Sequence, residues 1–260
     1  MSRLPRADAA VVFGSGLTVV PDGYEVVDEI GYDELRWPAT AVAGHPDRLL
    51  VAERAGGSRL LLACGRVHLY EGWSPDEVGR PVRDLAAVGV RALLLTNAAG
   101  ALSPRCPPGT AVLVTDVVDL QEPPVGEPPV LPVCRLDQAE ALAGLVAPWL
   151  SSGTGRYVAV PGPQYESPIE AGWLAGYGDV VGMSAASELR AAAEAKLPVA
   201  VLALVVNRAG AALGHADVLA AGARLAEGLS HALPPVAEAL SGVLSASEES
   251  GPGPEAGSPR

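Results

Sequence analysis

Short apolar runs alternate with amphipathic stretches along most of this chain. The apolar runs are rich in valine, leucine and alanine and are typical of buried β-strands. They lie at residues 9–14, 48–53, 59–64, 91–97, 110–118, 156–162 and 198–207. Helical periodicity is found near residues 80–88, 137–150, 168–176, 185–196 and 216–241. Strands that alternate with helices predict an α/β fold with a mostly parallel central sheet, buried on both faces.

Two segments lack this pattern. Proline and acidic residues crowd DLQEPPVGEPPVLPV at residues 119–133, where we expect one long surface loop. The C-terminal residues 246–260 are of low complexity, and we expect them to be disordered. The pattern therefore predicts one folded domain over residues 1–245, followed by a tail.

Composition limits the class of protein. The chain has 260 residues, of which 49% are hydrophobic, and this is enough for a sizeable core. Its apolar runs are shorter than the roughly 18 residues of a membrane span, and the N-terminus lacks a signal-peptide cleavage pattern, so we expect a cytoplasmic protein. Cys64, Cys106 and Cys134 are widely spaced without a CxxC pair, which predicts free thiols.

The charge and the missing motifs exclude several chemistries. A formal net charge of -12 argues against a general nucleic-acid surface, so any bound phosphate must lie in a local pocket. Lys196 is the only lysine and ends a predicted helix, which disfavours Walker-type and Schiff-base chemistry. The sequence has neither HExxH nor GxSxG, which disfavours a metal site and a serine hydrolase.

Candidate chemistry is densest in CGRVHLYEGW, residues 64–73, directly after an apolar strand. On an extended chain side chains alternate between faces, so Arg66, His68 and Tyr70 share one face. Val67 and Leu69 point the other way. We interpret one face as chemistry and the other as packing.

Two small-residue turns follow predicted strands. In GSGL the backbone amides and the Ser15 hydroxyl could face an anion, although an ordinary glycine-rich turn has the same composition. In LLLTNAAGAL the pair Thr96 and Asn97 ends a strand where open α/β sheets place their sites. Gly100 there permits a ligand to approach the backbone, but a simple strand-to-loop transition would look similar.

Two later segments also combine polar and apolar groups. PGPQYESP presents Tyr165 and Glu166, which could supply a stacking face and an acceptor for a planar heterocycle, although most glutamates are simply solvated. VVGMSAASELR joins a strand to a helix, where Met183 suits the core and Ser184 suits either a helix cap or an anion.

Histidines supply the remaining candidates. His231 lies in a helical pattern and is assigned to structure. His45, His68 and His215 lie beside turn residues and are better candidates for ligand contact.

Eight segments together resemble the trimeric purine nucleoside phosphorylase family in order and spacing, over about residues 8–240. They are GSGL, AGHPDR, GRVHLYEG, LLLTNAAGALSP, PGPQYESP, DVVGMSAASEL, LVVNRAG and GHADVLAAG. The resemblance implies a single α/β domain with a twisted mixed sheet flanked by helices, a homotrimer, and phosphorolysis of purine nucleosides. It implies inorganic phosphate as co-substrate and no cofactor beyond it, and the charge, the short apolar runs and the missing metal motif add no nucleic acid, membrane or metal as partner.

The resemblance also implies roles for individual residues. Phosphate would be bound by Ser15, His45 on a mobile loop, Arg66, His68, the backbone amide of Ala98, and Ser184. The nucleoside would be contacted by Tyr70, Ala99, Gly100, Tyr165, Glu166, Met183, Asn207 and His215. Catalysis would rest on His68, Glu166 and Asn207, with Glu166 accepting from N1–H of the base and Asn207 contacting O6 and N7.

Three departures from the family pattern accompany these roles. Thr18 stands where glycine is common and is expected to intrude on the phosphate loop. The stretch 119–136 is shortened and has no phenylalanine, so the aromatic that a neighbouring subunit usually lends to the sugar pocket has no counterpart there. The segment between Asn207 and His215 is also short.

We expect a phosphorylase of 6-oxopurine nucleosides, which are inosine, guanosine and their 2'-deoxy forms. One alternative is a methylthioadenosine phosphorylase, against which Asn207 speaks because an aspartate would be expected there. Another is a degenerate, non-catalytic nucleoside-binding homologue, which the presence of Arg66, His68 and Ser184 disfavours.

Overall fold

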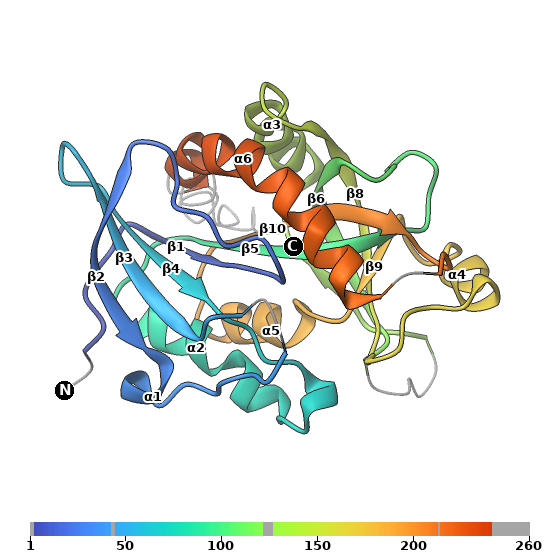
Figure 1. Ribbon diagram of the computed structural model, residues 1–260, viewed down its shortest axis with the longest axis horizontal. Coiled ribbons are helices and arrows are strands. Elements are labelled where there is room, and N and C mark those ends of the chain that lie inside the picture. Colours follow the sequence, from blue (N-terminus) through green and yellow to red (C-terminus); the bar gives the residue numbers. More distant parts are fainter. Residues whose placement is uncertain (1–2, 43–44, 122–126, 213, 241–260) are drawn as a thin grey trace, which may run out of the picture.

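The computed structural model describes residues 3–42, 45–121, 127–212 and 214–240. Its strands are β1 (Ala9–Val12), β2 (Tyr24–Gly31), β3 (Arg48–Arg54), β4 (Arg59–Cys64), β5 (Leu93–Ala101), β6 (Thr110–Asp119), β7 (Val130–Pro132), β8 (Ser151–Ala159), β9 (Val180–Gly182) and β10 (Val199–Arg208). Its α-helices are α1 (Tyr32–Leu35), α2 (Pro75–Ala87), α3 (Leu136–Val146), α4 (Pro168–Leu174), α5 (Ala186–Glu194) and α6 (His215–Ala239). A short 3-10 turn, Leu69–Glu71, follows β4. The elements form an α/β domain around one sheet (Figure 1).

The sheet is mixed, not mostly parallel. Strands β1, β4, β5 and β10 run parallel in adjacent pairs. Strand β3 pairs antiparallel with β4, because residues 55–58, which include Gly56 and Gly57, turn the chain back directly, and β2 pairs antiparallel with β3 at the edge of the sheet. Strand β10 also pairs antiparallel with β6. Through β8 and β9 the pairing returns to β5, so these strands close a ring.

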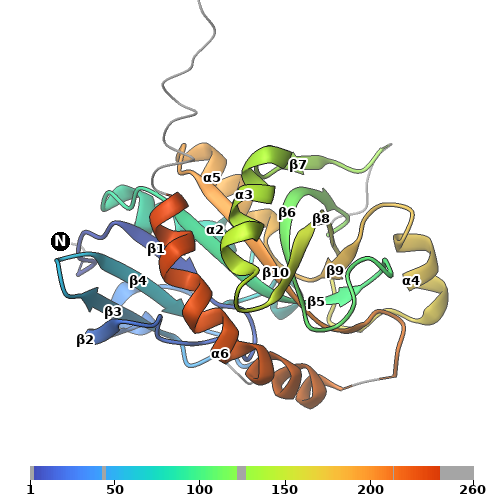
Figure 2. The same ribbon diagram turned by 90° about the horizontal axis from the view of Figure 1, so that it is seen from above.

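Helices cover both faces of the sheet (Figures 1 and 2). Side chains of α2 and α5 pack with Leu61 and Ala63 of β4, while those of α3 and α6 pack with Leu60 and Leu62. Because successive side chains of a strand point to opposite faces, a continuous apolar run is what a sheet covered on both sides requires. The predicted burial on both faces is confirmed.

Several elements differ from the expectation. Strand β2 was not predicted, because five of its eight positions are exposed and it shows no strand periodicity. The stretch 119–133 is not one loop, since Val130–Pro132 pairs with β6 as an edge strand that tolerates proline. Helix α2 begins five residues before the predicted 80–88, at Pro75, where Ser74 and Glu77 form a capping box. The predicted tail at 246–260 lies outside the described residues.

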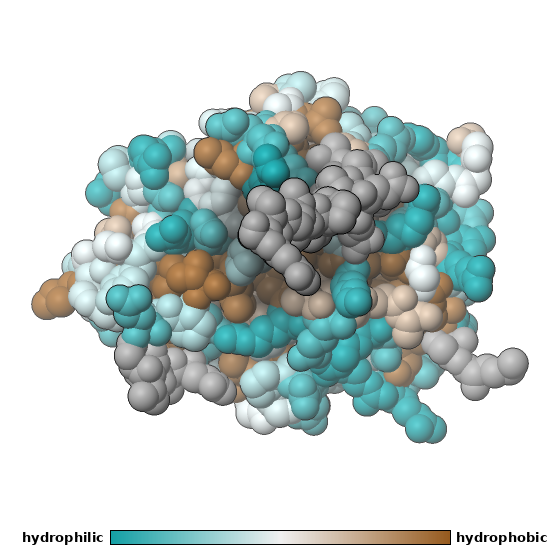
Figure 3. Space-filling view, turned by 180° about the vertical axis from the view of Figure 1, so that it is seen from behind, coloured by the Kyte–Doolittle hydropathy of each residue, from teal (hydrophilic) through white to brown (hydrophobic). Residues whose placement is uncertain are grey.

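One face of the molecule is mainly polar. Figure 3 shows one face on which hydrophilic side chains predominate among the described residues and apolar ones form separate patches. None of the helices in the described part of the chain is long and apolar enough to cross a membrane.

Candidate active site

The site lies where one edge of β5 is left open. On that edge β1 pairs with residues 93–95 and β9 with residues 100–101, while β10 follows the other edge along most of its length. No described strand pairs with residues 96–99 on the open edge. Backbone and side-chain groups of this short stretch can therefore face a ligand, as at the switch points of other α/β sheets.

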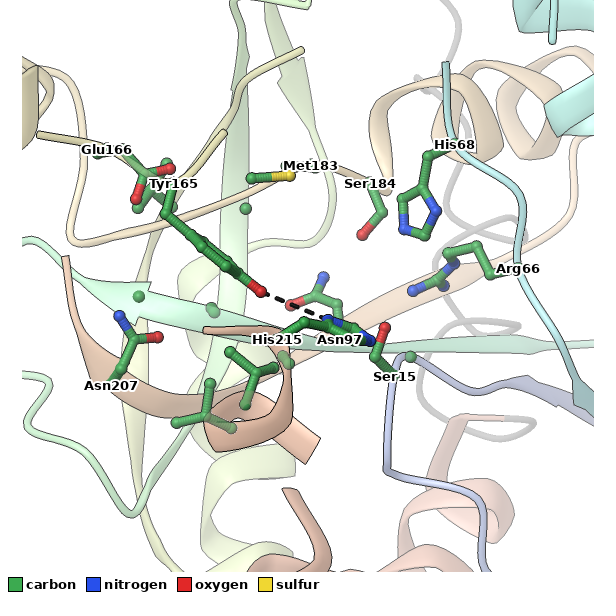
Figure 4. Close-up of a pocket in the computed structure, with 18 of the residues that line it drawn as sticks. Ser15, Arg66, His68, Asn97, Tyr165, Glu166, Met183, Ser184, Asn207 and His215 are labelled. Carbon is green, nitrogen blue, oxygen red and sulfur yellow. Dashed lines mark hydrogen bonds between the residues drawn. The ribbon is translucent and has the colours of Figure 1, made fainter. Parts of the chain in front are cut away.

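A cavity opens at this gap. It is lined by Gly14, Ser15, Arg66, His68, Tyr70, Asn97, Ala98, Ala99, Gly100, Tyr165, Glu166, Val181, Gly182, Met183, Ser184, Val206, Asn207, His215 and Val218. Every residue that the sequence singled out for ligand contact is present except His45. Figure 4 shows two ends: Arg66, His68 and Ser184 lie together at one, while Glu166 and Asn207 lie at the other.

Arg66 forms the charged part of the first end. Its Nε donates to Oε1 of Glu188 at 2.8 Å, and its Nη1 donates to the carbonyl oxygen of Thr96 at 2.6 Å. Nη2 is buried and has no partner among the described residues. A guanidinium held on two sides with free N–H groups beside Ser15 and Ser184 suits an anion.

His45 lies behind Ser15 instead of lining the cavity. Its Nδ1 accepts from the backbone N–H of Arg66 at 3.2 Å, and its Nε2 lies 2.9 Å from Oγ of Ser15. Burial, reinforced by His68 and Arg66, lowers the pKa of His45 to about 3. The ring is therefore neutral, and since Nδ1 accepts, Nε2 carries the proton and donates to Ser15. The structure thus places His45 against a proposed phosphate ligand and not in the cavity wall.

His68 is oriented by Glu71. Its Nδ1 lies 3.2 Å from Oε1 of Glu71, and the same oxygen accepts the backbone N–H of His68 at 2.8 Å. Burial alone would raise the pKa of Glu71, but hydrogen bonds from His68 and Thr40 outweigh it and leave this pKa below its usual value. The carboxylate can only accept, so Nδ1 carries a proton and Nε2 remains for a ligand. Tyr70 stacks on the imidazole with ring centroids 4.8 Å apart.

The second end suits a heterocycle. Burial raises the pKa of Glu166, and nearby Glu170 adds to the effect. One amide N–H of Asn207 donates to the carbonyl oxygen of Arg208 at 2.9 Å, which leaves the other N–H and Oδ1 for a ligand. The hydroxyl of Tyr165 lies 3.5 Å from Nδ1 of His215, the first residue of α6 (Figure 4). The short segment before His215 therefore still brings this residue into the cavity wall.

Asn97, which the sequence placed near a site without giving it a role in binding, lines the cavity. It is 2% exposed, yet Oδ1 and Nδ2 have no partner among the described residues, and Figure 4 places it between the two ends. An amide buried in this way costs free energy unless a ligand or water satisfies it. The feature of the sequence that pointed to Asn97 was the polar pair Thr96 and Asn97 within an otherwise apolar strand.

In the turn after β1, Gly14 lies close to β5. A methyl group at Gly14 would lie 2.7 Å from Cα of Asn97, so glycine permits this close approach. Thr18 does not line the cavity, contrary to the expected intrusion. His231 stacks on Trp149 with ring centroids 4.8 Å apart and does not line this cavity. No group of three or more His, Cys, Asp or Glu side chains in the described residues could hold a metal.

Comparison with known proteins places the chain in a class. The family model described as the phosphorylase superfamily matches residues 15–237. Similar proteins include purine nucleoside phosphorylase of Mycobacterium tuberculosis, 40% identical over 83% of each chain, and purine nucleoside phosphorylase 1 of Bacillus subtilis, 31% identical over 78% of this chain and 80% of that one. A crystal structure of Schistosoma purine nucleoside phosphorylase with hypoxanthine superposes with a TM-score of 0.73 at 27% identity, covering 89% of this chain and 90% of that one.

The chain belongs to the phosphorylase superfamily and, within it, to the purine nucleoside phosphorylases.

Proposed function

We propose that this protein cleaves 6-oxopurine nucleosides by phosphorolysis, giving the free base and (deoxy)ribose 1-phosphate. The observation that carries the proposal is one cavity with Arg66 at one end, whose Nη2 has no partner among the described residues, and with Glu166 and Asn207 at the other end. A substrate that carries a sugar between a phosphate and a purine would reach both ends. Inorganic phosphate is the co-substrate, and no organic cofactor or metal takes part.

At the phosphate end, one charged guanidinium and several neutral donors bind the phosphate dianion. Arg66 offers Nη2, Ser15 and Ser184 offer hydroxyls, and the backbone amide of Ala98 lies on the open edge of β5. His45 donates to the oxygen of Ser15, so the hydroxyl proton of Ser15 is left to point at phosphate. The phosphate oxygen attacks C1' as the bond to N9 breaks, and its negative charge stabilises the oxocarbenium-like sugar.

At the base end, polarity selects the purine. A 6-oxopurine presents N1–H as a donor and O6 as an acceptor, whereas adenine presents N1 as an acceptor and an amino group as a donor. The Glu166 carboxylate can only accept, and the Asn207 amide can donate to O6 and accept from N7–H as the leaving base gains a proton. Each mismatched buried polar group costs about 1–3 kcal/mol, so we expect a preference for inosine and guanosine.

A homotrimer is part of the proposal. Its support, besides the family resemblance, is an apolar surface beside the base end: Trp173 and Ile169 of α4 are 57% and 86% exposed. Trp173 lines a second cavity, which shares Tyr165 and Glu166 with the first. In a trimer, a neighbouring copy of the chain would cover this surface. Sedimentation should then give about three times the chain mass of 26.4 kDa.

One assay tests the function. Release of base from inosine, guanosine and adenosine should require phosphate and should be fastest for the first two. A preference for adenosine or methylthioadenosine would favour the adenine-directed alternative. Nucleoside binding without phosphate-dependent cleavage would favour the non-catalytic one.

A further inference from the structure

Glu188 is a buried carboxylate that touches two parts of the phosphate end without lining the cavity. Its Oε1 accepts Nε–H of Arg66 at 2.8 Å, and its Oε2 accepts the backbone N–H of Ala185 at 2.9 Å. The side chains of Arg66 and Glu188 are only 2% and 4% exposed. One carboxylate therefore joins the segment after β4 to the turn after β9, although Arg66 and Glu188 are 122 positions apart in sequence.

On the first side, Glu188 fixes the direction of Arg66. A guanidinium is planar, so holding Nε on Glu188 and Nη1 on the Thr96 carbonyl sets the whole plane. Nη2 is then the nitrogen left over: it is buried without a partner among the described residues, and Arg66 lines the cavity. Without Glu188, rotation about the side-chain bonds would no longer be restricted in this way.

On the second side, Glu188 supports the turn that carries Ser184. Ala185 has φ 75°, a left-handed conformation that costs free energy for a residue with a side chain. The hydrogen bond from the Ala185 N–H to Oε2 offsets part of this cost. Glu188 is the third residue of α5, so its carboxylate also meets the positive end of that helix. The position of Ser184, the preceding residue, depends on this turn.

The negative charge of Glu188 is by itself unfavourable next to a phosphate site. A carboxylate near a bound phosphate dianion repels it, so the charge of Glu188 by itself weakens phosphate binding. Its two hydrogen bonds act in the opposite direction, because they place Arg66 and Ser184 before the ligand arrives.

We propose that Glu188 is a positioning residue that aligns the Arg66 guanidinium and the Ser184 turn as one unit for phosphate. The inference rests on the proposed function, in which these two residues bind the co-substrate. Glu188 does not touch the reacting atoms.

Two substitutions separate geometry from charge. Glu188→Gln has one oxygen for two donors, so its amide N–H₂ must face either Arg66 or Ala185. Glu188→Asp keeps the charge but is one methylene shorter and cannot span both donors. Because Asp still compensates the buried charge of Arg66, this variant avoids the main reason for which Glu188→Gln could fail to fold. Glu194→Gln is the matched control, since Glu194 lies on the same helix and pairs with Arg83 at the surface.

The measurement is calorimetric affinity for inorganic phosphate in the full chain, followed by KM for phosphate and for inosine. Both Glu188 variants should bind phosphate roughly tenfold to a hundredfold more weakly, as expected for misplaced ligating groups, while KM for inosine changes little. Tighter phosphate binding by Glu188→Gln, or unchanged binding by Glu188→Asp, would overturn the proposal, because charge alone would then explain the residue. A wild type that binds phosphate without cleaving nucleosides would contradict the proposed function and leave the binding comparison valid.

Discussion

Nε2 of His45 lies 2.9 Å from Oγ of Ser15, and Nδ1 of the same ring accepts the backbone N–H of Arg66. A neutral histidine can make this pair of contacts with only one tautomer, the one that donates from Nε2. The ring therefore ties two proposed phosphate ligands, Ser15 and Arg66, to one loop residue. A kinetic role for His45 follows from this geometry without direct contact with phosphate.

His45→Leu should raise KM for phosphate about fivefold, because the Ser15 hydroxyl then loses a hydrogen bond that orients it, which is worth about 1 kcal/mol. His45→Gln retains an N–H donor near the position of Nε2 and should show a smaller increase. Steady-state kinetics at saturating inosine would measure both. Equal effects of Leu and Gln would argue against the orienting hydrogen bond.

His45 should also make the fold sensitive to acid. Its pKa falls from the ordinary 6.5 to about 3 in the folded protein, mainly through burial. Between these values the unfolded chain binds a proton that the folded chain does not, so stability is lost as the pH falls from 6.5 toward 3. For one group the slope is at most about 1.4 kcal/mol per pH unit. Denaturant unfolding at several pH values should show a shallower acid slope for His45→Gln, and an identical slope would contradict the neutral, buried ring.

Glu166 should control how nucleoside affinity depends on pH. Burial raises its pKa, so this carboxyl takes up a proton at a higher pH than an ordinary glutamate does. A protonated carboxyl no longer accepts N1–H with full strength, and KM for inosine should therefore rise as the pH falls through this pKa. Glu170 contributes to the raised pKa, so Glu170→Gln should move the midpoint to lower pH. A pH profile of KM for inosine that is the same in Glu166→Gln and wild type would exclude this role.

Asn207 should discriminate between the two classes of purine. In Asn207→Asp an acceptor replaces the amide donor, so the amino group of adenine gains a partner and O6 of hypoxanthine loses one. The ratio of kcat/KM for adenosine to that for inosine should rise by about tenfold or more, the equivalent of one buried polar group. The folded variant must be compared with wild type in the same assay. A ratio that does not move would show that the base is read by other groups.

Local pattern alone predicted much of this protein. The alternation in GRVHLY predicted that Arg66, His68 and Tyr70 lie together, and all three line the cavity. The strand period explains this only in part, because the chain is extended at His68 but Tyr70 lies in the 3-10 turn Leu69–Glu71, so this turn and not the strand period stacks Tyr70 on His68. Most buried strands and the longer helices were likewise predicted from apolar periodicity. Strand β2 was missed because an exposed edge has little burial to impose a pattern.

Long-range contacts decided the rest. The open edge of β5 exists because the pairing with β1 and with β9 stops on either side of residues 96–99. The register between strands that are distant in sequence cannot be predicted from the local pattern of apolar residues. The contacts of His45 with Ser15 and of Glu188 with Arg66 join residues 30 and 122 positions apart. The low pKa of His45 comes mainly from burial, and Asn97 is buried with an amide that has no partner among the described residues. The sequence determined which chemical groups this protein carries. Only tertiary packing decided which of these groups are buried, which histidine is kept neutral, and which side chains line the same cavity.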